Sequence, residues 1–233
     1  MNTPLSTPMS RPVALVTGAS RGIGRAIALA LAPTHHVLVG GRDASLVAGV
    51  VAELESAAPF VADLTDEAAV TRAVAGIDHL DVLVHSAGAV TFGPLAESTT
   101  AEWHELLDLN VIAPATLTRL LLPALRSAHG LVVFLNSGSG LVSHRGFAVY
   151  SASKFALTAL ADALRLDERG RVRVTSVHPG RVATDMQAQL TALEGQPYIP
   201  DAHLDAADVA RLVRLAVDLP PDASLDTVRI TPV

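Results

Sequence analysis

The chain alternates between short, β-branched apolar runs and longer helical stretches. The apolar runs are hydrophobic at consecutive positions, which is typical of parallel strands buried on both faces. Repeated alternation indicates βαβ crossovers and a parallel sheet with helices on both faces. The predicted strands are Val13–Thr17, Val37–Gly40, Phe60–Ala62, Val82–His85, Leu131–Asn136, Val172–Val177 and Val228–Thr231. The predicted helices are Ile23–Ala32, Ala44–Ser56, Glu67–Ala75, Ala101–Ser127, Ala148–Arg169 and Ala207–Leu219.

Composition agrees with one large α/β domain and excludes several other classes of protein. Half of the 233 residues are hydrophobic and 17% are charged, which is enough apolar surface for a core. The absence of cysteine excludes disulfides, thiolate nucleophiles and cysteine-ligated metals. The nine histidines form no metal-binding motif, so we expect no metal. The net charge of −6 gives no reason to expect a nucleic-acid partner.

The mean hydropathy of +0.40 raises the question of a membrane segment. A spanning helix needs about 20 consecutive, mostly apolar residues. The uncharged runs Ala26–Gly41 and Gly130–His144 are interrupted by proline, histidine, glycine and serine. Met1–Arg11 has neither the basic nor the apolar region of a secretory signal. We therefore expect a soluble, cytoplasmic protein that does not bind membranes.

We expect a flexible tail at residues 1–11 and one domain over residues 12–233. Thr184–Asp205 is the least periodic stretch of this domain. Long irregular segments inside compact domains often act as lids. The sequence therefore predicts a substrate lid over about residues 184–205.

A glycine-rich turn, TGASRGIG, joins the first strand to the first helix. Glycines let the backbone approach a pyrophosphate, and the N–H groups at a helix start bind anions. Such a turn can also exist only to pack a strand against a helix, but its position here, between a strand and a helix, favours dinucleotide binding. The predicted contacts are Gly18, Ser20, Arg21, Gly22, Ile23 and Gly24.

The spacing Gly-x-x-x-Gly-x-Gly after a threonine resembles the signature of the short-chain dehydrogenase/reductase family, classical type. The resemblance implies a single-domain Rossmann fold, with a doubly wound, mostly parallel sheet of seven strands. It also implies a nicotinamide cofactor and hydride transfer to or from a carbonyl or alcohol carbon.

The end of the second strand bears on the choice between NAD and NADP. An acidic residue there selects the ribose 2′-OH of NAD, and an arginine pairs with the 2′-phosphate of NADP. By resemblance, Gly41 stands where NAD-dependent members carry the acid, and Arg42 follows it. Arg21 matches a second basic position of NADP-dependent members. Asp43 is a rival ribose ligand, but we prefer to interpret it as the N-cap of the next helix. We expect NADP(H).

Three further segments match the family in order along the chain. Asp63 and Leu64, after the third strand, correspond to adenine contacts, and Asp63 has an N-cap as its alternative role. Ala87 and Gly88 follow His85-Ser86, where the family carries two asparagines. Pro-Gly-x-Val-x-Thr supplies the remaining implied cofactor contacts: Pro179, Gly180, Val182 and Thr184.

Tyr150 and Lys154 are the strongest catalytic candidates. Residues four apart share one helix face, and an ammonium beside a phenol lowers its pKa, as a general acid/base needs. Lys154 is the only lysine, against sixteen arginines, which suggests that a compact ammonium is needed there. The alternative is a surface tyrosine beside a solvated lysine. By resemblance, both side chains also contact the cofactor.

The resemblance adds Ser137 and Asn110 to the catalytic set. Ser137 lies thirteen residues before Tyr150, a spacing that Ser139 fits less well. Asn110 lies within a predicted helix, where asparagine is unfavourable, and its alternative is a solvent-facing residue. The implied roles are proton transfer by Tyr150, hydrogen bonding to the substrate oxygen by Ser137, ribose binding by Lys154, and a water held by Asn110 that relays protons to Lys154.

Three other functions compete with an oxidoreductase. A non-catalytic NADP(H)-binding regulator would typically have lost the tyrosine or the lysine. A methyltransferase using S-adenosylmethionine would need an acid at the end of the second strand. An epimerase of the extended type would need more than the roughly fifty residues that follow Gly180.

The substrate is predicted only by class, as a small-to-medium, fairly apolar carbonyl or alcohol. We expect the pocket to be lined by Leu141, Val142, His144 and Phe147, and by Met186, Leu190, Leu193 and Tyr198 of the lid. The two longest predicted helices have more apolar positions than one sheet face can cover. We therefore expect a homodimer or a homotetramer.

Overall fold

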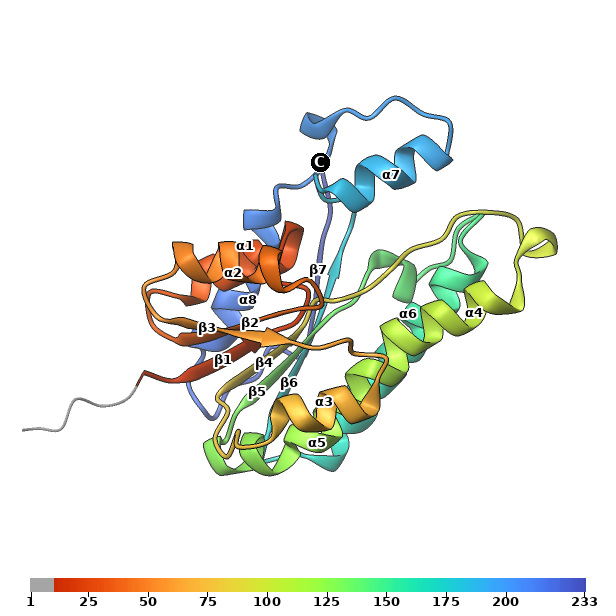
Figure 1. The fold of residues 1–233 in the computed structure, drawn as a ribbon. Coiled ribbons are helices and arrows are strands. Elements are labelled where there is room, and N and C mark those ends of the chain that lie inside the picture. The colour runs from red at the N-terminus through yellow and green to blue at the C-terminus, as the bar shows by residue number, and fades with distance from the viewer. Residues whose placement is uncertain (1–10) are drawn as a thin grey trace, which may run out of the picture.

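A computed structural model of the chain describes residues 11–233 and contains one seven-stranded parallel sheet, in the order β3-β2-β1-β4-β5-β6-β7 (Figure 1). The order reverses between β1 and β4, so loops from both halves of the sheet meet at one edge. The doubly wound fold predicted from the sequence is confirmed. The strands are β1 (Val13–Val16), β2 (His36–Gly41), β3 (Ala57–Val61), β4 (Val82–His85), β5 (Leu131–Leu135), β6 (Arg173–Pro179) and β7 (Thr227–Ile230).

Helices cover both faces of the sheet. One apolar core lies between the sheet and α1, α2 and α8, and the other between the sheet and α3, α5 and α6. Adjacent β1 residues Leu15 and Val16 belong to different cores, which explains why the strands are apolar at consecutive positions. The helices are α1 (Gly22–Leu31), α2 (Ala44–Glu53), α3 (Glu67–Val74), α4 (Thr100–Leu107), α5 (Ala113–Ala128), α6 (Ala148–Asp167), α7 (Asp185–Leu193) and α8 (Ala206–Asp218).

The predicted helix Ala101–Ser127 is interrupted by one turn of π-helix. This turn, Asp108–Ile112, joins α4 to α5 and makes a helical stretch of 29 residues, Thr100–Ala128. By length and composition this stretch is apolar enough to span a membrane. It was not among the uncharged runs that were compared with a spanning helix above. Its residues Leu106, Leu117 and Leu121 are buried within the described fold, as in the core helix of a soluble protein.

The predicted lid is partly helical. Residues Asp185–Leu193 form α7, which begins at Thr184, whose hydroxyl accepts a hydrogen bond from the Gln187 N–H. Arg181 and Glu194 form a two-hydrogen-bond ion pair, at 2.7 and 2.6 Å, that joins the two ends of this helix. This helix was not predicted, because only a few of its positions are buried and its residues show no apolar periodicity.

The described part of the chain begins one residue before the predicted domain. Residues 1–10 of the predicted tail lie outside the described part of the chain. Arg11, the last residue of that tail, donates to the Ala32 carbonyl and pairs with Glu55, so it belongs to the described fold.

Candidate active site

The glycine-rich turn TGASRGIG is a tight backbone turn between β1 and α1. Gly18 and Gly22 have φ angles of 62° and 55°, which favour glycine. A Cβ on Gly24 would lie 2.3 Å from the Gly18 carbonyl oxygen. Arg21, the N-cap of α1, makes no side-chain capping bond. The first N–H groups of α1 therefore remain free to donate hydrogen bonds to an anion bound at the turn. This geometry fits a pyrophosphate.

A cleft of about 640 Å³ runs from this turn along the carboxyl ends of the strands. It brings together most of the predicted cofactor contacts and two of the four predicted catalytic residues. The predicted residues that line it are Gly18, Ser20, Arg21, Gly22, Ile23, Gly24, Arg42, Asp63, Leu64, Ala87, Gly88, Tyr150, Lys154, Pro179 and Thr184.

Gly180 and Val182 are not among the residues that line the cleft. The Gly180 N–H donates to the Ile230 carbonyl at 2.7 Å, which ties the segment to the end of β7. Val182 is buried and pairs with Leu204 in an isolated bridge. Through these contacts both residues fix the backbone conformation of the segment that leads to Thr184.

Two arginines lie at the end of the cleft near β2. Arg21 and Arg42 both line it, and Arg42 is one of the groups that lower the pKa of Asp63, after the hydrogen bonds from Thr65. A Cβ on Gly41 would lie 2.7 Å from Val47 Cγ2, so an acidic side chain at this position would require the Val47 side chain to shift. The site therefore presents positive charge where a ribose-binding acid would otherwise stand.

Asp43 is the N-cap of α2. Its carboxylate accepts hydrogen bonds from the N–H groups of Ser45 and Leu46, at 2.9 and 3.1 Å. A bond from the Ser45 hydroxyl contributes most to lowering the pKa of Asp43. This is the capping role that we preferred over ribose binding.

His85 replaces an asparagine of the family pattern and points away from the cleft. Its Nε2 lies 2.7 Å from the Thr118 hydroxyl, and its ring stacks on Phe134. Burial lowers the pKa of His85 to about 3, so the ring is neutral. The substitution leaves the backbone of Ala87 and Gly88 at the cleft, where close approach was expected.

Tyr150 and Lys154 lie on the first turns of α6, with the Lys154 Nζ 5.8 Å from the centre of the Tyr150 ring. Lys154 is 5% exposed, and its Nζ donates to the Leu135 carbonyl at 3.1 Å. Burial lowers the pKa of Lys154 to about 8. Burial also raises the pKa of Tyr150, and a hydrogen bond with Ser137 opposes this rise. The expectation that Lys154 lowers the pKa of Tyr150 is wrong here, because the phenol is desolvated and the ammonium donates to Leu135.

Ser137 lies two residues beyond the end of β5, and its side chain contacts the Tyr150 hydroxyl. Its backbone N–H donates to Asn136 Oδ1 at 2.9 Å, and its Oγ accepts from the Ser139 N–H at 3.1 Å. Ser139 thus contacts Ser137 through its backbone, within the short 3-10 turn Gly138–Gly140. The geometry favours Ser137 over Ser139 as the partner of Tyr150.

Asn110 lies in the π-helical turn and is 1% exposed, so the solvent-facing alternative is wrong. Its Oδ1 accepts from the Ala89 N–H at 2.9 Å, and its Nδ2 donates to the Ala89 carbonyl and the Ser153 hydroxyl, both at 3.0 Å. The amide therefore holds the loop after β4 against α6. Any water relay toward Lys154 would have to use other atoms of this turn, because the side chain is already engaged.

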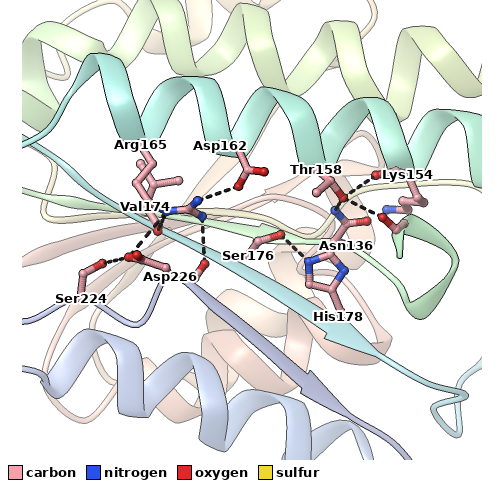
Figure 2. Close-up of polar contacts among 11 residues, drawn as sticks. Asn136, Lys154, Thr158, Asp162, Arg165, Val174, Ser176, His178, Ser224 and Asp226 are labelled. Atoms are coloured by element: carbon pink, nitrogen blue, oxygen red, sulfur yellow. Dashed lines mark hydrogen bonds and ion pairs between the residues drawn. The ribbon is translucent and has the colours of Figure 1, made fainter. Parts of the chain in front are cut away.

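Three residues that surround Ser137 and Lys154 were not predicted from the sequence. Asn136 Nδ2 donates to the Thr158 hydroxyl at 2.9 Å, and that hydroxyl lies 3.1 Å from the carbonyl oxygens of both Gly140 and Lys154. His178 Nδ1 lies 2.9 Å from the Ser137 carbonyl. Figure 2 shows Asn136 and His178 below α6, next to Thr158 and Lys154, which belong to that helix. Their positions next to Ser137, one turn after Lys154 and before Pro179 are the signals that could have indicated them.

The predicted substrate wall is only partly at the cleft. Met186 lines it, while Leu190 is buried in the fold and Leu193 is exposed. Tyr198 packs edge-on against His203 within the lid. Leu141 and Val142, in the loop after the 3-10 turn, are exposed and are not among the residues that line the cleft.

Comparison with known proteins gives one consistent result. The family model described as short chain dehydrogenase matches residues 12–195. An uncharacterized short-chain type dehydrogenase/reductase of Sinorhizobium fredii is 36% identical over 205 residues, which cover 84% of this chain and 81% of the relative.

Solved structures agree with this match over almost the whole chain. A metagenomic short-chain oxidoreductase in complex with NADP is 30% identical, with a TM-score of 0.81 and coverage of 97% of this chain and 99% of that one. An alcohol dehydrogenase from the archaeon Thermococcus sibiricus, complexed with 5-hydroxy-NADP, is 25% identical, with a TM-score of 0.85 and coverage of 94% and 95%.

Removal of the Asn110 amide tests its role in holding the loop after β4. We expect Asn110→Ala to lower the free energy of unfolding by about 2 kcal/mol, because the partly buried N–H and C=O of Ala89 lose their partner. Urea unfolding measures this loss, and Ser153→Ala, which removes only one of the three bonds, is the milder control. Equal stability of wild type and Asn110→Ala would contradict the assignment.

Proposed function

This chain belongs to the short chain dehydrogenase family, and we propose that it is an NADP(H)-dependent oxidoreductase of a small-to-medium carbonyl or alcohol substrate. The observation that carries the proposal is the cleft that brings the glycine turn, Arg42, Tyr150 and Lys154 together. The cofactor, when bound, supplies or accepts a hydride at its nicotinamide ring. The protein orients the substrate and handles the proton.

The phosphate-binding end of the cleft supports NADP(H) over NAD(H). Arg21 and Arg42 can pair with a 2′-phosphate, and Gly41 offers no carboxylate to the ribose 2′-OH. The two solved relatives described above carry NADP or an NADP analogue. We place the pyrophosphate at the start of α1 and the nicotinamide near Tyr150 and Thr184.

In the proposed reaction Tyr150 is the general acid/base. In reduction its hydroxyl donates a proton to the oxygen of the nascent alkoxide, and in oxidation it removes the alcohol proton. Ser137 hydrogen-bonds the same oxygen, which is most effective as negative charge develops there. Lys154, with a pKa of about 8, is mostly protonated at neutral pH, so its ammonium would donate a hydrogen bond to the nicotinamide ribose.

Replacement of the proton donor tests this reaction. We expect Tyr150→Phe to lower kcat by at least about a hundredfold, because general acid/base catalysis contributes this much or more. NADPH affinity, measured by fluorescence titration, should stay nearly unchanged. Retained turnover in Tyr150→Phe, followed by NADPH absorbance with a carbonyl panel, would refute the role of Tyr150.

Replacement of Arg42 tests the choice of cofactor. We expect Arg42→Ala to raise the KM for NADPH about tenfold, which is the loss of one charge-assisted hydrogen bond, and to leave the KM for NADH nearly unchanged. Asp43→Asn, next in the chain but directed at the start of α2, is the matched control. Equal efficiency of the wild type with NADH and NADPH would contradict the proposal.

A non-catalytic NADP(H)-binding regulator remains the alternative function. The buried Lys154 and the contact between Ser137 and Tyr150 favour an enzyme, because a regulator has no use for them. NADPH binding without turnover across a broad panel of carbonyls and alcohols would favour the regulator. The apolar side chains that line the cleft, which include Val90, Leu109 and Met186, fit a small-to-medium substrate with few charges.

We also propose a cytoplasmic homodimer or homotetramer. Apolar side chains stay exposed on the long helices, with Ile112 54%, Phe155 45% and Leu166 68% exposed. Phe155 and Leu166 are eleven residues apart on α6 and so share one helix face. An exposed face of this kind is typical of a subunit interface.

Substitution of Phe155 tests the interface. We expect light scattering at micromolar concentration to give a dimer or tetramer for the wild type and a smaller species for Phe155→Glu. Leu46→Glu, at a position that is 50% exposed on α2, should leave the mass unchanged. A monomeric wild type would contradict the prediction.

A further inference from the structure

His178 is a fully buried histidine that the reaction described above does not use. It lies on β6, on the sheet face covered by α6, and has no exposed surface. Its Nδ1 lies 2.9 Å from the Ser137 carbonyl oxygen, and its Nε2 lies 2.9 Å from the Ser176 hydroxyl. Figure 2 shows Ser176 and His178 in line below α6, close to Asn136 and Lys154.

The two partners determine which ring nitrogen carries the proton. A backbone carbonyl only accepts hydrogen bonds, so Nδ1 is the protonated nitrogen and donates to Ser137. Nε2 of the neutral ring is then an acceptor, and the Ser176 hydroxyl donates to it. Burial contributes most to lowering the pKa of His178, with Lys154 and Arg229 also lowering it and the Ser137 carbonyl and Asp162 opposing them.

Ser137 needs such a contact because it lies just beyond the end of β5. The Asn136 N–H still donates to the Val177 carbonyl of β6 at 2.8 Å. At the next residue the contact with β6 is made by a side chain, since the Ser137 carbonyl accepts from His178. That carbonyl also accepts from the Gly140 N–H at 2.9 Å, so both of its lone pairs are engaged.

We propose that His178 is a positioning residue: its Nδ1–H fixes the Ser137 carbonyl, which holds the Ser137 hydroxyl against Tyr150, and Ser176 fixes the tautomer. This inference rests on the proposed oxidoreductase function. It explains why a residue with two polar nitrogens occupies a site that an apolar side chain could fill. The nitrogen that matters is Nδ1, and this distinguishes positioning from simple packing.

Two amide variants separate the two ring nitrogens. In His178→Asn the amide nitrogen occupies about the place of Nδ1 and can still donate to Ser137. In His178→Gln the amide occupies about the place of Nε2 and faces Ser176. We expect kcat to stay near the wild-type value in His178→Asn and to fall about ten- to a hundredfold in His178→Gln, because small displacements of a reacting group cost this much.

The affinity for NADPH, measured by fluorescence titration, should stay within about twofold of the wild-type value in both variants, because the Kd does not depend on Ser137. Ser176→Ala should lower kcat less than His178→Gln, since only the tautomer is released. Equal kcat values in His178→Asn and His178→Gln would overturn the proposal, and so would a fall in both that only follows the loss in melting temperature.

A second readout does not depend on turnover. The chain has two tyrosines, Tyr150 and Tyr198, so ¹³Cζ-tyrosine NMR gives two signals, which Tyr198→Phe assigns. We expect the Tyr150 signal to move in His178→Gln and to stay in place in His178→Asn, because the hydrogen bond from Ser137 changes only in the former. An unmoved Tyr150 signal in both overturns the proposal. If His178→Gln does not fold, His178→Leu, which also lacks a donor to the Ser137 carbonyl, takes its place in the same comparison.

A wild type without turnover on the carbonyl panel would refute the proposed function alone. The NMR comparison would then still decide whether His178 positions Ser137.

Discussion

The site depends on the need to satisfy backbone N–H and C=O groups where β1, β4 and β5 leave the sheet. Groups that are buried there have no strand partner, and each must find another. Side chains supply these partners: the Thr17 hydroxyl accepts from Ser86 and Ala87, the Asn110 amide binds both polar groups of Ala89, and Asn136 accepts from the Ser137 N–H. The loops at this edge are therefore held by polar side chains, and the cleft takes its shape from them.

The same requirement explains the electrostatics of the catalytic pair. Lys154 is almost fully buried, and its ammonium donates to the Leu135 carbonyl at the end of β5. Burial lowers the pKa of this lysine to about 8 and raises that of Tyr150 above its ordinary value, so the two pKa values move apart. Two ionisable groups in one cleft whose pKa values are both shifted by burial are typical of an active site. Ser137 is the polar contact that opposes the desolvation of the phenol.

The sequence alone predicted the sheet, the glycine turn and the Tyr150–Lys154 pair, because these follow from local periodicity and helical spacing. It could not predict the π-helical turn at Asn110, which comes from tertiary contacts with Ala89 and Ser153 rather than from propensity. Helix α7 was missed because few of its positions are apolar and buried. His178 was missed because its partner, Ser137, lies 41 positions away in the chain. The direction of the Tyr150 pKa was wrong because spacing reveals neighbours but not burial.

In the proposed reaction the cleft holds a nicotinamide next to a substrate carbon. The most direct test is to incubate the wild type with NADPH deuterated at both C4 positions and a panel of ketones and aldehydes, and to measure the alcohols by mass spectrometry. We expect at least one of these alcohols to carry a single deuterium on its carbinol carbon. NADPH that binds to the protein but transfers no deuterium to any carbonyl would contradict it.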